Sequence, residues 1–241
     1  MTSRDRLIVA LDSPTADAAR GLVAGLAGHV GMFKVGSQLF TAAGPGFVEE
    51  LVARGERVFL DLKYHDIPTT VAKAAAAAAR LGVSLLDVHA LGGRAMIEGA
   101  VAALAGGGAR LLAITILTSH AQADLDSIGV GGPIAAAVRR LALLARAAGA
   151  HGVVASPHEV GLVREACGPD FLVVTPGIRP AGVHADDQAR AATPAAALTA
   201  GADYLVVGRP ITEARDPARE ADAIVREMEA ARNPSVRGPG L

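Results

Sequence analysis

Short runs of consecutive apolar residues return at similar intervals along this chain, and a helix-forming segment follows each of them. Continuous Val, Ile and Leu without polar alternation is typical of parallel strands that are buried on both faces. We place these runs at residues 7–11, 31–35, 57–62, 84–89, 111–117, 152–155, 171–174 and 204–207. Eight strand–helix units in one domain predict an α/β fold, namely a single closed (β/α)₈ TIM barrel.

The helices are expected between these runs. The sequence Asp12-Ser13-Pro14 should cap the first helix, at about 15–27. An alanine tract at 74–79 suits a helix that starts at Pro68, because alanine is the best helix former. We expect the other helices at about 45–54 and 133–148, after Gly93, and from about Pro157, Thr193 and Asp216.

An open doubly wound sheet is the alternative fold, but it would need a glycine-rich first turn. The first turn here, Asp12-Ser13-Pro14, has no glycine. A chain of 241 residues also suits one large barrel domain, and no linker divides it. We therefore predict a barrel domain at 1–231 and a flexible C-terminal tail at 232–241, where Pro and Gly recur.

Composition excludes several classes of function. The chain has 23 Lys and Arg against 24 Asp and Glu, so its formal net charge of −1 suggests no nucleic-acid or anionic membrane partner. Its single cysteine, Cys167, cannot form an internal disulfide, and the seven histidines show no metal-binding spacing. No signal peptide and no apolar run of the ~20 residues that span a bilayer is visible, so we expect a soluble, cytoplasmic protein.

Charged residues gather at the ends of the first three runs. In barrels of this kind the active site lies at the carboxyl ends of the strands. Strand alternation puts Asp12, Lys34, Asp61 and Lys63 in phase with inward-facing residues. A single such residue would be a solvated ion pair, but four on adjacent strands indicate a site where acids keep a lysine protonated as a proton donor. Asp66 lies beyond the third run and could turn back to this site or reach a neighbour.

A second cluster follows runs seven and eight, where such barrels commonly bind phosphate. Glycines let backbone amides approach an anion, and arginine offers bidentate hydrogen bonds to it. The cluster comprises Gly177-Ile178-Arg179, Asp187-Gln188 and Gly208-Arg209. Two other motifs stay open: His89 is either a hydrogen-bonded rim residue or a base, and Thr118-Ser119 either contacts a ligand or caps the next segment.

Together these motifs resemble the orotidine 5′-phosphate decarboxylase family over nearly the whole chain. The matching segments are Leu11-Asp12, Phe33-Lys34-Val35-Gly36, Asp61-Leu62-Lys63-Tyr64-His65-Asp66-Ile67-Pro68, Leu117-Thr118-Ser119, Thr175-Pro176-Gly177-Ile178-Arg179-Pro180, Asp187-Gln188 and Val207-Gly208-Arg209-Pro210-Ile211-Thr212. The resemblance implies decarboxylation of orotidine 5′-phosphate to UMP and CO₂, the last step of de novo pyrimidine synthesis, without a cofactor or a metal.

The resemblance also implies a role for each site residue. Lys63 would stabilise and protonate the C6 carbanion within a catalytic array of Lys34, Asp61, Lys63 and Asp66. In a homodimer, Asp66 and Ile67 would reach the partner's site. The substrate-binding residues would be Asp12 and Lys34 at the ribose, Thr118 at the pyrimidine, Arg179, Gln188, Gly208 and Arg209 at the phosphate, and Asp61, Ile67 and Thr70.

Two alternatives compete with this interpretation. Related sugar-phosphate barrels that use a metal-stabilised enediolate usually carry Glu where this chain has Lys34, and a lysine there would repel a divalent cation. A catalytically silent nucleotide-binding barrel would keep the phosphate site but should have lost one of Asp61, Lys63 or Asp66. All three are present.

Overall fold

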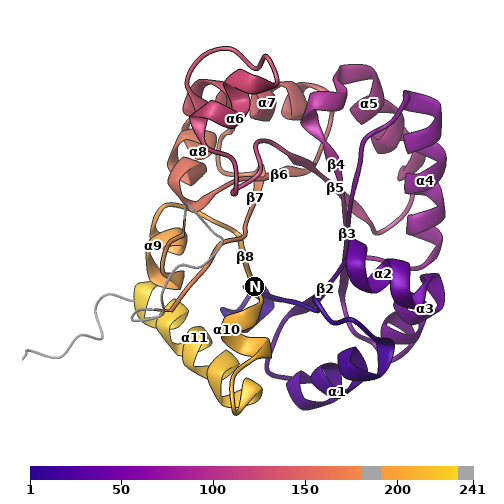
Figure 1. Cartoon of the computed structure of the whole chain (residues 1–241), viewed down its shortest axis with the longest axis vertical. Helices are drawn as coiled ribbons and strands as arrows, with labels where there is room; N and C mark the ends of the chain where they lie inside the picture. Colours follow the sequence, from indigo (N-terminus) through magenta and orange to yellow (C-terminus); the bar gives the residue numbers. More distant parts are fainter. Residues whose placement is uncertain (181–190, 233–241) are drawn as a thin grey trace, which may run out of the picture.

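The computed structural model describes residues 1–180 and 191–232. In this part of the chain, eight parallel strands form a closed barrel in chain order, and β8 pairs with β1 to close it (Figure 1). The predicted (β/α)₈ barrel is therefore confirmed. The strands are β1 (Leu7–Ala10), β2 (Met32–Gly36), β3 (Val58–Tyr64), β4 (Leu85–His89), β5 (Arg110–Ile114), β6 (Gly152–Val154), β7 (Leu172–Thr175) and β8 (Tyr204–Val207).

The helices surround the barrel, and their number exceeds the prediction (Figure 1). Short α2, α6 and α10 were not predicted, because none of them is long enough to show a clear helical period. The α-helices are α1 (Ala16–Leu26), α2 (Ser37–Ala43), α3 (Pro45–Ala53), α4 (Pro68–Arg80), α5 (Arg94–Ala103), α6 (Gln122–Ser127), α7 (Ile134–Ala147), α8 (Val160–Cys167), α9 (Pro194–Thr199), α10 (Arg209–Thr212) and α11 (Pro217–Arg232).

Several boundaries differ from the prediction, among them β5, which ends at Ile114 and not at residue 117, and β3, which extends to Tyr64. The hydroxyl of Thr15 accepts a hydrogen bond from the backbone N–H of Ala18 at 3.3 Å, so Thr15 caps α1 and the predicted cap, Asp12-Ser13-Pro14, is wrong. At the other end, α11 ends with Arg232, the first residue of the predicted tail. The rest of that tail lies outside the described residues, as does Gln188.

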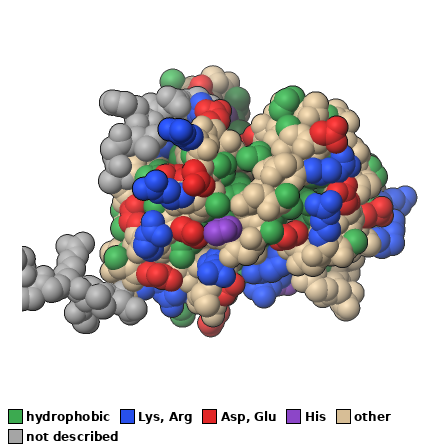
Figure 2. All heavy atoms as spheres, turned by 90° about the horizontal axis from the view of Figure 1, so that it is seen from below, with side chains coloured by type: hydrophobic (Ala, Val, Ile, Leu, Met, Phe, Trp, Pro, Cys, Tyr) green, Lys and Arg blue, Asp and Glu red, His purple; other side chains and the backbone are tan. Residues whose placement is uncertain are grey.

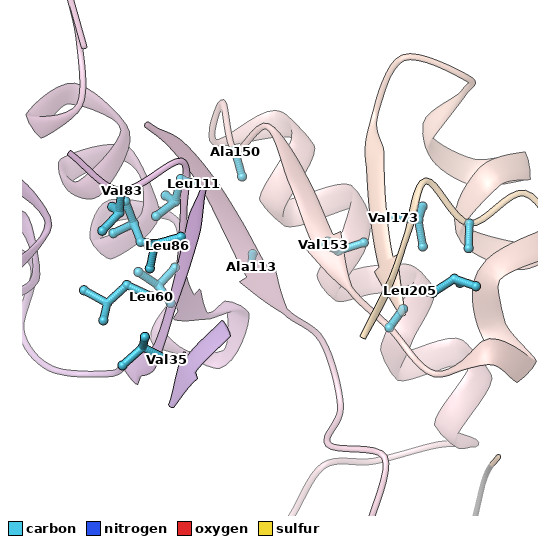
Figure 3. Packing of buried hydrophobic residues seen from close by; sticks show 14 of the residues in the cluster. Val35, Leu60, Val83, Leu86, Leu111, Ala113, Ala150, Val153, Val173 and Leu205 are labelled. Atoms are coloured by element: carbon cyan, nitrogen blue, oxygen red, sulfur yellow. The ribbon is translucent and has the colours of Figure 1, made fainter. Parts of the chain in front are cut away.

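Side-chain alternation divides the core into two layers. Val35, Leu60, Leu86 and Leu205 belong to the outer layer, between the strands and the helices (Figure 3). The barrel interior holds a smaller cluster, made of Ile8, Ala10, Met32, Phe59, Leu85, Leu112, Val174, Tyr204 and Val206. Interior side chains close the barrel below the carboxyl ends of the strands, so a ligand can enter only above them.

One irregularity interrupts the sheet between β3 and β4. Leu60 pairs with Leu86, but the next pair joins Tyr64 to Val88, so β3 holds two extra residues at this point. Within the bulge, Lys63 has a φ of 54°, in the left-handed region that few non-glycine residues adopt. Such a conformation costs about 1–3 kcal/mol and persists only where the surroundings hold it.

Arg164, which lies on α8, connects several segments at the amino-terminal end of the barrel. Its guanidinium donates to the carbonyls of Gly168, Pro169, Phe171 and Gly201 and to Oδ2 of Asp203, the last at 2.7 Å. These contacts connect α8 to the loops that enter β7 and β8. Arg164 therefore stabilises the end of the barrel away from the charged cluster.

The surface carries both signs of charge. On the face in Figure 2, basic and acidic side chains lie interspersed, in keeping with the near-neutral net charge of −1. None of the helices in the described ranges is long and apolar enough to span a lipid bilayer.

Candidate active site

A cavity of about 280 Å³ opens at the carboxyl ends of the strands. It holds residues from both predicted clusters, which come from opposite ends of the sequence and meet because the barrel closes. The predicted residues that line it are Asp12, Lys34, Asp61, Lys63, Thr118, Arg179, Gly208 and Arg209.

Acids and lysines alternate along one side of this cavity. Nζ of Lys34 lies 3.3 Å from Oδ1 of Asp12 and 3.0 Å from Oδ2 of Asp61. The other oxygen of Asp61, Oδ1, pairs with Nζ of Lys63. Asp61 thus holds both lysines, one on each oxygen. Its side chain is 10% exposed and that of Lys34 11%, so these charges are sheltered from water.

Each buried charge in this row is stabilised by its neighbours. Burial opposes the ammonium form of Lys34, but Asp61 and Asp12 outweigh it, so the pKa of Lys34 is raised. Burial also opposes ionisation of Asp61, but Lys34, the Asp87 hydrogen bond and Lys63 together hold the pKa of Asp61 well below its usual range. The row therefore presents a fixed carboxylate between two cationic amines.

Asp87 is a site residue that the sequence analysis missed. Its side chain lines the cavity, is only 1% exposed, and accepts a hydrogen bond from the backbone N–H of Lys63 at 2.8 Å. Burial, and then the nearby charge of Asp61, raise the pKa of Asp87 well above its usual range. The signal was available, because Asp87 alternates in phase with the inward-facing Leu85.

Arginines and glycines form the other side of the cavity. Arg179 is 9% exposed and its Nη1 donates to the carbonyl of Ile178 at 3.0 Å, which directs the guanidinium along the cavity wall. Gly177, with a φ of 74°, makes the turn that a residue with a side chain would strain. Gly208 and Arg209 follow β8 on the same wall. Two cationic side chains beside glycine backbone suit a phosphate group.

Three of the predicted residues do not line the cavity of their own chain. Asp66, Ile67 and Thr70 are exposed, and the Ile67 side chain is 64% accessible. Oδ1 of Asp66 accepts a hydrogen bond from the backbone N–H of Ile67 at 2.6 Å. His89 also lies outside the cavity lining, with its ring centroid 5.6 Å from that of His65.

Comparison with known proteins identifies the family. Residues 5–224 match the model of the Orotidine 5′-phosphate decarboxylase / HUMPS family. The chain belongs to this family. Among curated members, it is 57% identical over 228 residues to orotidine 5′-phosphate decarboxylase of Halorhodospira halophila, covering 94% of this chain and 97% of that protein. It is 53% identical to the enzyme of the same name from Syntrophotalea carbinolica, covering 95% and 97%.

A solved structure of the family supports the same assignment. The crystal structure of orotidine 5′-phosphate decarboxylase from Lactobacillus acidophilus superposes with a TM-score of 0.84 at 42% identity, covering 93% of this chain and 99% of that one. An uncharacterised protein from Geobacillus kaustophilus superposes with a TM-score of 0.81 at 37% identity, covering 92% and 99%. The similarity thus spans the whole barrel.

Proposed function

We propose that this protein decarboxylates orotidine 5′-phosphate to UMP and CO₂, in the last step of UMP synthesis, and that Lys63 stabilises and protonates the C6 carbanion. The observation that carries the proposal is the shared cavity, which joins the Lys34–Asp61–Lys63 row to Arg179 and Arg209. A nucleotide with a phosphate at one end and a carboxylate on its base would meet a cationic group at both ends.

The chemistry needs a cation beside C6 of the pyrimidine. When the bond between C6 and the carboxylate breaks, CO₂ leaves and the electron pair stays on C6 as a poorly delocalised carbanion. An ammonium that is already in place stabilises this charge as it develops. Lys63 then transfers a proton to C6, which gives UMP, and the neutral amine regains a proton from water.

Asp61 positions the proton donor. Since Asp61 pairs with Lys63 through one oxygen and with Lys34 through the other, neither amine can swing away without leaving one buried carboxylate oxygen without its cationic partner. The protein's own side chains hold this arrangement, so the reaction needs little reorganisation of the site. No step in this scheme calls for a cofactor.

Binding energy at the phosphate would serve the distant chemical step. Arg179 and Arg209 also line the cavity, although they come from the other end of the sequence than the lysine row. Their charge-assisted hydrogen bonds to a phosphate would be stronger than hydrogen bonds between neutral groups. Binding energy from a part of the substrate that does not react can drive loop closure and raise the rate. Asp12 and Lys34, between the two walls, would hold the ribose, and Thr118 would contact the base.

We further propose a homodimer in which Asp66 and Ile67 complete the partner's site. Two features support it: both residues are exposed in their own chain, and the exposed apolar side chains include Ile67 at 64% and Leu91 at 42%, on segments that flank α4 and α5. Thr70, exposed on the first turn of α4, would join the substrate-binding residues there. A cytoplasmic location also stays a proposal.

The competing function within the same family model is metal-dependent chemistry on a sugar phosphate. The ammonium of Lys34 already lies between the carboxylates of Asp12 and Asp61, where a divalent cation would have to bind. The test is to treat the protein exhaustively with EDTA and follow the ultraviolet absorbance of orotidine 5′-phosphate. We expect full turnover after the treatment. No turnover, or strict dependence on added Mg²⁺, would overturn the proposal.

A further inference from the structure

Asp87 combines two features that an ionised carboxylate could not easily hold together. It lines the same cavity as Asp61, whose negative charge helps to raise the pKa of Asp87, and it is almost completely buried at 1% exposure. Two carboxylates can only accept hydrogen bonds, so a bond between them needs a proton on one of the pair. Asp61 already bonds two ammonium groups, which leaves Asp87 as the group that carries the proton.

The unmatched oxygen of Asp87 leads to the same conclusion. Oδ1 accepts the Lys63 N–H, whereas Oδ2 is buried and meets no donor among the described residues. A buried ionised oxygen without a donor would be costly. With a proton on Asp87, the side chain itself becomes the donor and the ionised Asp61 becomes its acceptor. Both carboxyl groups are then satisfied.

The β3 bulge explains why a side chain of β4 has to accept the backbone N–H of Lys63. The two extra residues of β3 displace the ladder between Leu60 and Tyr64, so the N–H of Lys63 bonds to Asp87 rather than to the backbone of β4. Lys63 also carries the left-handed φ of 54°. Asp87 therefore holds the strained residue from which the lysine side chain extends toward Asp61.

We propose that Asp87 is a positioning residue that stays protonated in the folded protein, donates a hydrogen bond to Asp61 and fixes the backbone of Lys63. Its catalytic consequence rests on the proposed decarboxylation, but the location of the proton does not. A neutral acid here adds no second negative charge to the lysine row. It leaves Asp61, together with Asp12 at Lys34, to balance the charges of the two lysines.

The surroundings contain other groups that titrate. From β3, Asp61, Lys63 and Tyr64 face Asp87, and burial is the first cause that raises the pKa of Tyr64. On its own strand β4, His89 has a lowered pKa because of burial, His65 and Lys63. Leu112 of β5, in register with Asp87, is apolar. Asparagine is the substitution that isolates Asp87, since it keeps one acceptor and one donor and cannot ionise.

The first test measures stability against pH for wild type and Asp87→Asn. If the folded protein keeps a proton that the unfolded chain loses above a pH of about 4, wild type loses stability relative to the variant as pH rises. We expect the ratio of their unfolding constants to change about tenfold per pH unit until Asp87 ionises in the fold. Glu98→Gln, which removes an exposed carboxylate on α5, is the control and should keep a constant ratio to wild type. A constant ratio for Asp87→Asn as well would overturn the proposal.

The second test separates the proton from general structural damage. Infrared spectra of wild type should contain the carbonyl stretch of a protonated carboxyl that Asp87→Asn lacks; identical spectra would contradict the proposal.

In turnover of orotidine 5′-phosphate, Asp87→Leu should lower kcat at least about tenfold by releasing Lys63, and Asp87→Asn should recover most of that loss. Equal loss in both folded variants, or no loss in Asp87→Leu, would rule out the positioning role. Should Asp87→Leu fail to fold, the pH-dependent stability and the infrared spectrum of Asp87→Asn decide the proposal.

Discussion

Nζ of Lys34 lies 3.0 Å from Oδ2 of Asp61, and both side chains are almost closed to solvent. Removing one partner of such a pair leaves a buried charge, which typically costs about 3–5 kcal/mol. We therefore expect Lys34→Met to lower the free energy of unfolding by about 3 kcal/mol at neutral pH, measured by urea titration. Arg94→Met, which breaks the exposed Arg94–Glu98 pair, should cost less than about 1 kcal/mol. Equal losses would show that burial of the pair is unimportant.

The stability contributed by the Lys34–Asp61 pair should depend on pH in the acid range. Because the folded pKa of Asp61 is depressed, its ionisation contributes stability above a pH of about 4, and this contribution is lost as pH falls toward the folded pKa. Lys34→Met removes the largest attraction that lowers this pKa. The stability difference between wild type and Lys34→Met should therefore shrink below a pH of about 4. A difference that grows in acid would contradict the assignment of the charge to Asp61.

Replacing Arg164 should lower the stability of the protein without lowering its kcat. It binds four carbonyls and Asp203 at the amino-terminal end of the barrel, away from the cavity. Arg164→Met should cost about 3 kcal/mol of stability, since Asp203 loses its cationic partner. Below its melting temperature, the variant should keep the kcat of wild type. A loss of kcat in a fully folded sample would mean that the two ends of the barrel are coupled.

The arginine wall predicts selectivity for phosphate. Arg209→Ala should raise the dissociation constant of UMP about 10–100-fold, the value of one charge-assisted hydrogen bond or two. Uridine, which has no phosphate, should bind wild type and Arg209→Ala equally weakly. Isothermal titration with both ligands measures the difference. Parallel loss of uridine binding would place Arg209 at the base or ribose instead.

The shared site can be tested by mixing two inactive variants. If Asp66 acts in the partner's site, Lys63→Ala and Asp66→Ala subunits should form hybrid dimers in which one of the two sites is intact. We expect mixed samples to regain up to about a quarter of wild-type activity at equal concentrations, since half of the dimers are hybrids with one good site. No recovery, with subunit exchange demonstrated by mass spectrometry, would mean that Asp66 acts within its own chain.

The sequence predicted the barrel because each buried strand is a continuous apolar run, and it placed Asp12, Lys34 and Asp61 through simple alternation. Lys63 lines the predicted site, but simple alternation does not place it there, because the β3 bulge and the left-handed φ of Lys63 interrupt the alternation. A bulge depends on the pairing of two strands, so it leaves little local signal in either one.

Asp87 was missed for a related reason. Alternation puts Asp87 in phase with the inward-facing Leu85, but its hydrogen bond to Lys63 depends on the β3 bulge, which the sequence of neither strand indicates. Short α2, α6 and α10 escaped because their hydrogen bonds depend on the loops around them. The features beyond the reach of sequence are thus contacts between neighbouring strands and loops.

We infer that Lys63 supplies the cation and the proton at C6. Its most direct test is the kcat of Lys63→Ala on orotidine 5′-phosphate, followed by ultraviolet absorbance, with exposed Lys73→Ala of α4 as the matched control. We predict a fall of at least about 10³-fold for Lys63→Ala, from lost charge stabilisation and lost proton transfer, and none for Lys73→Ala. A folded Lys63→Ala protein that turns over within tenfold of wild type would contradict the account.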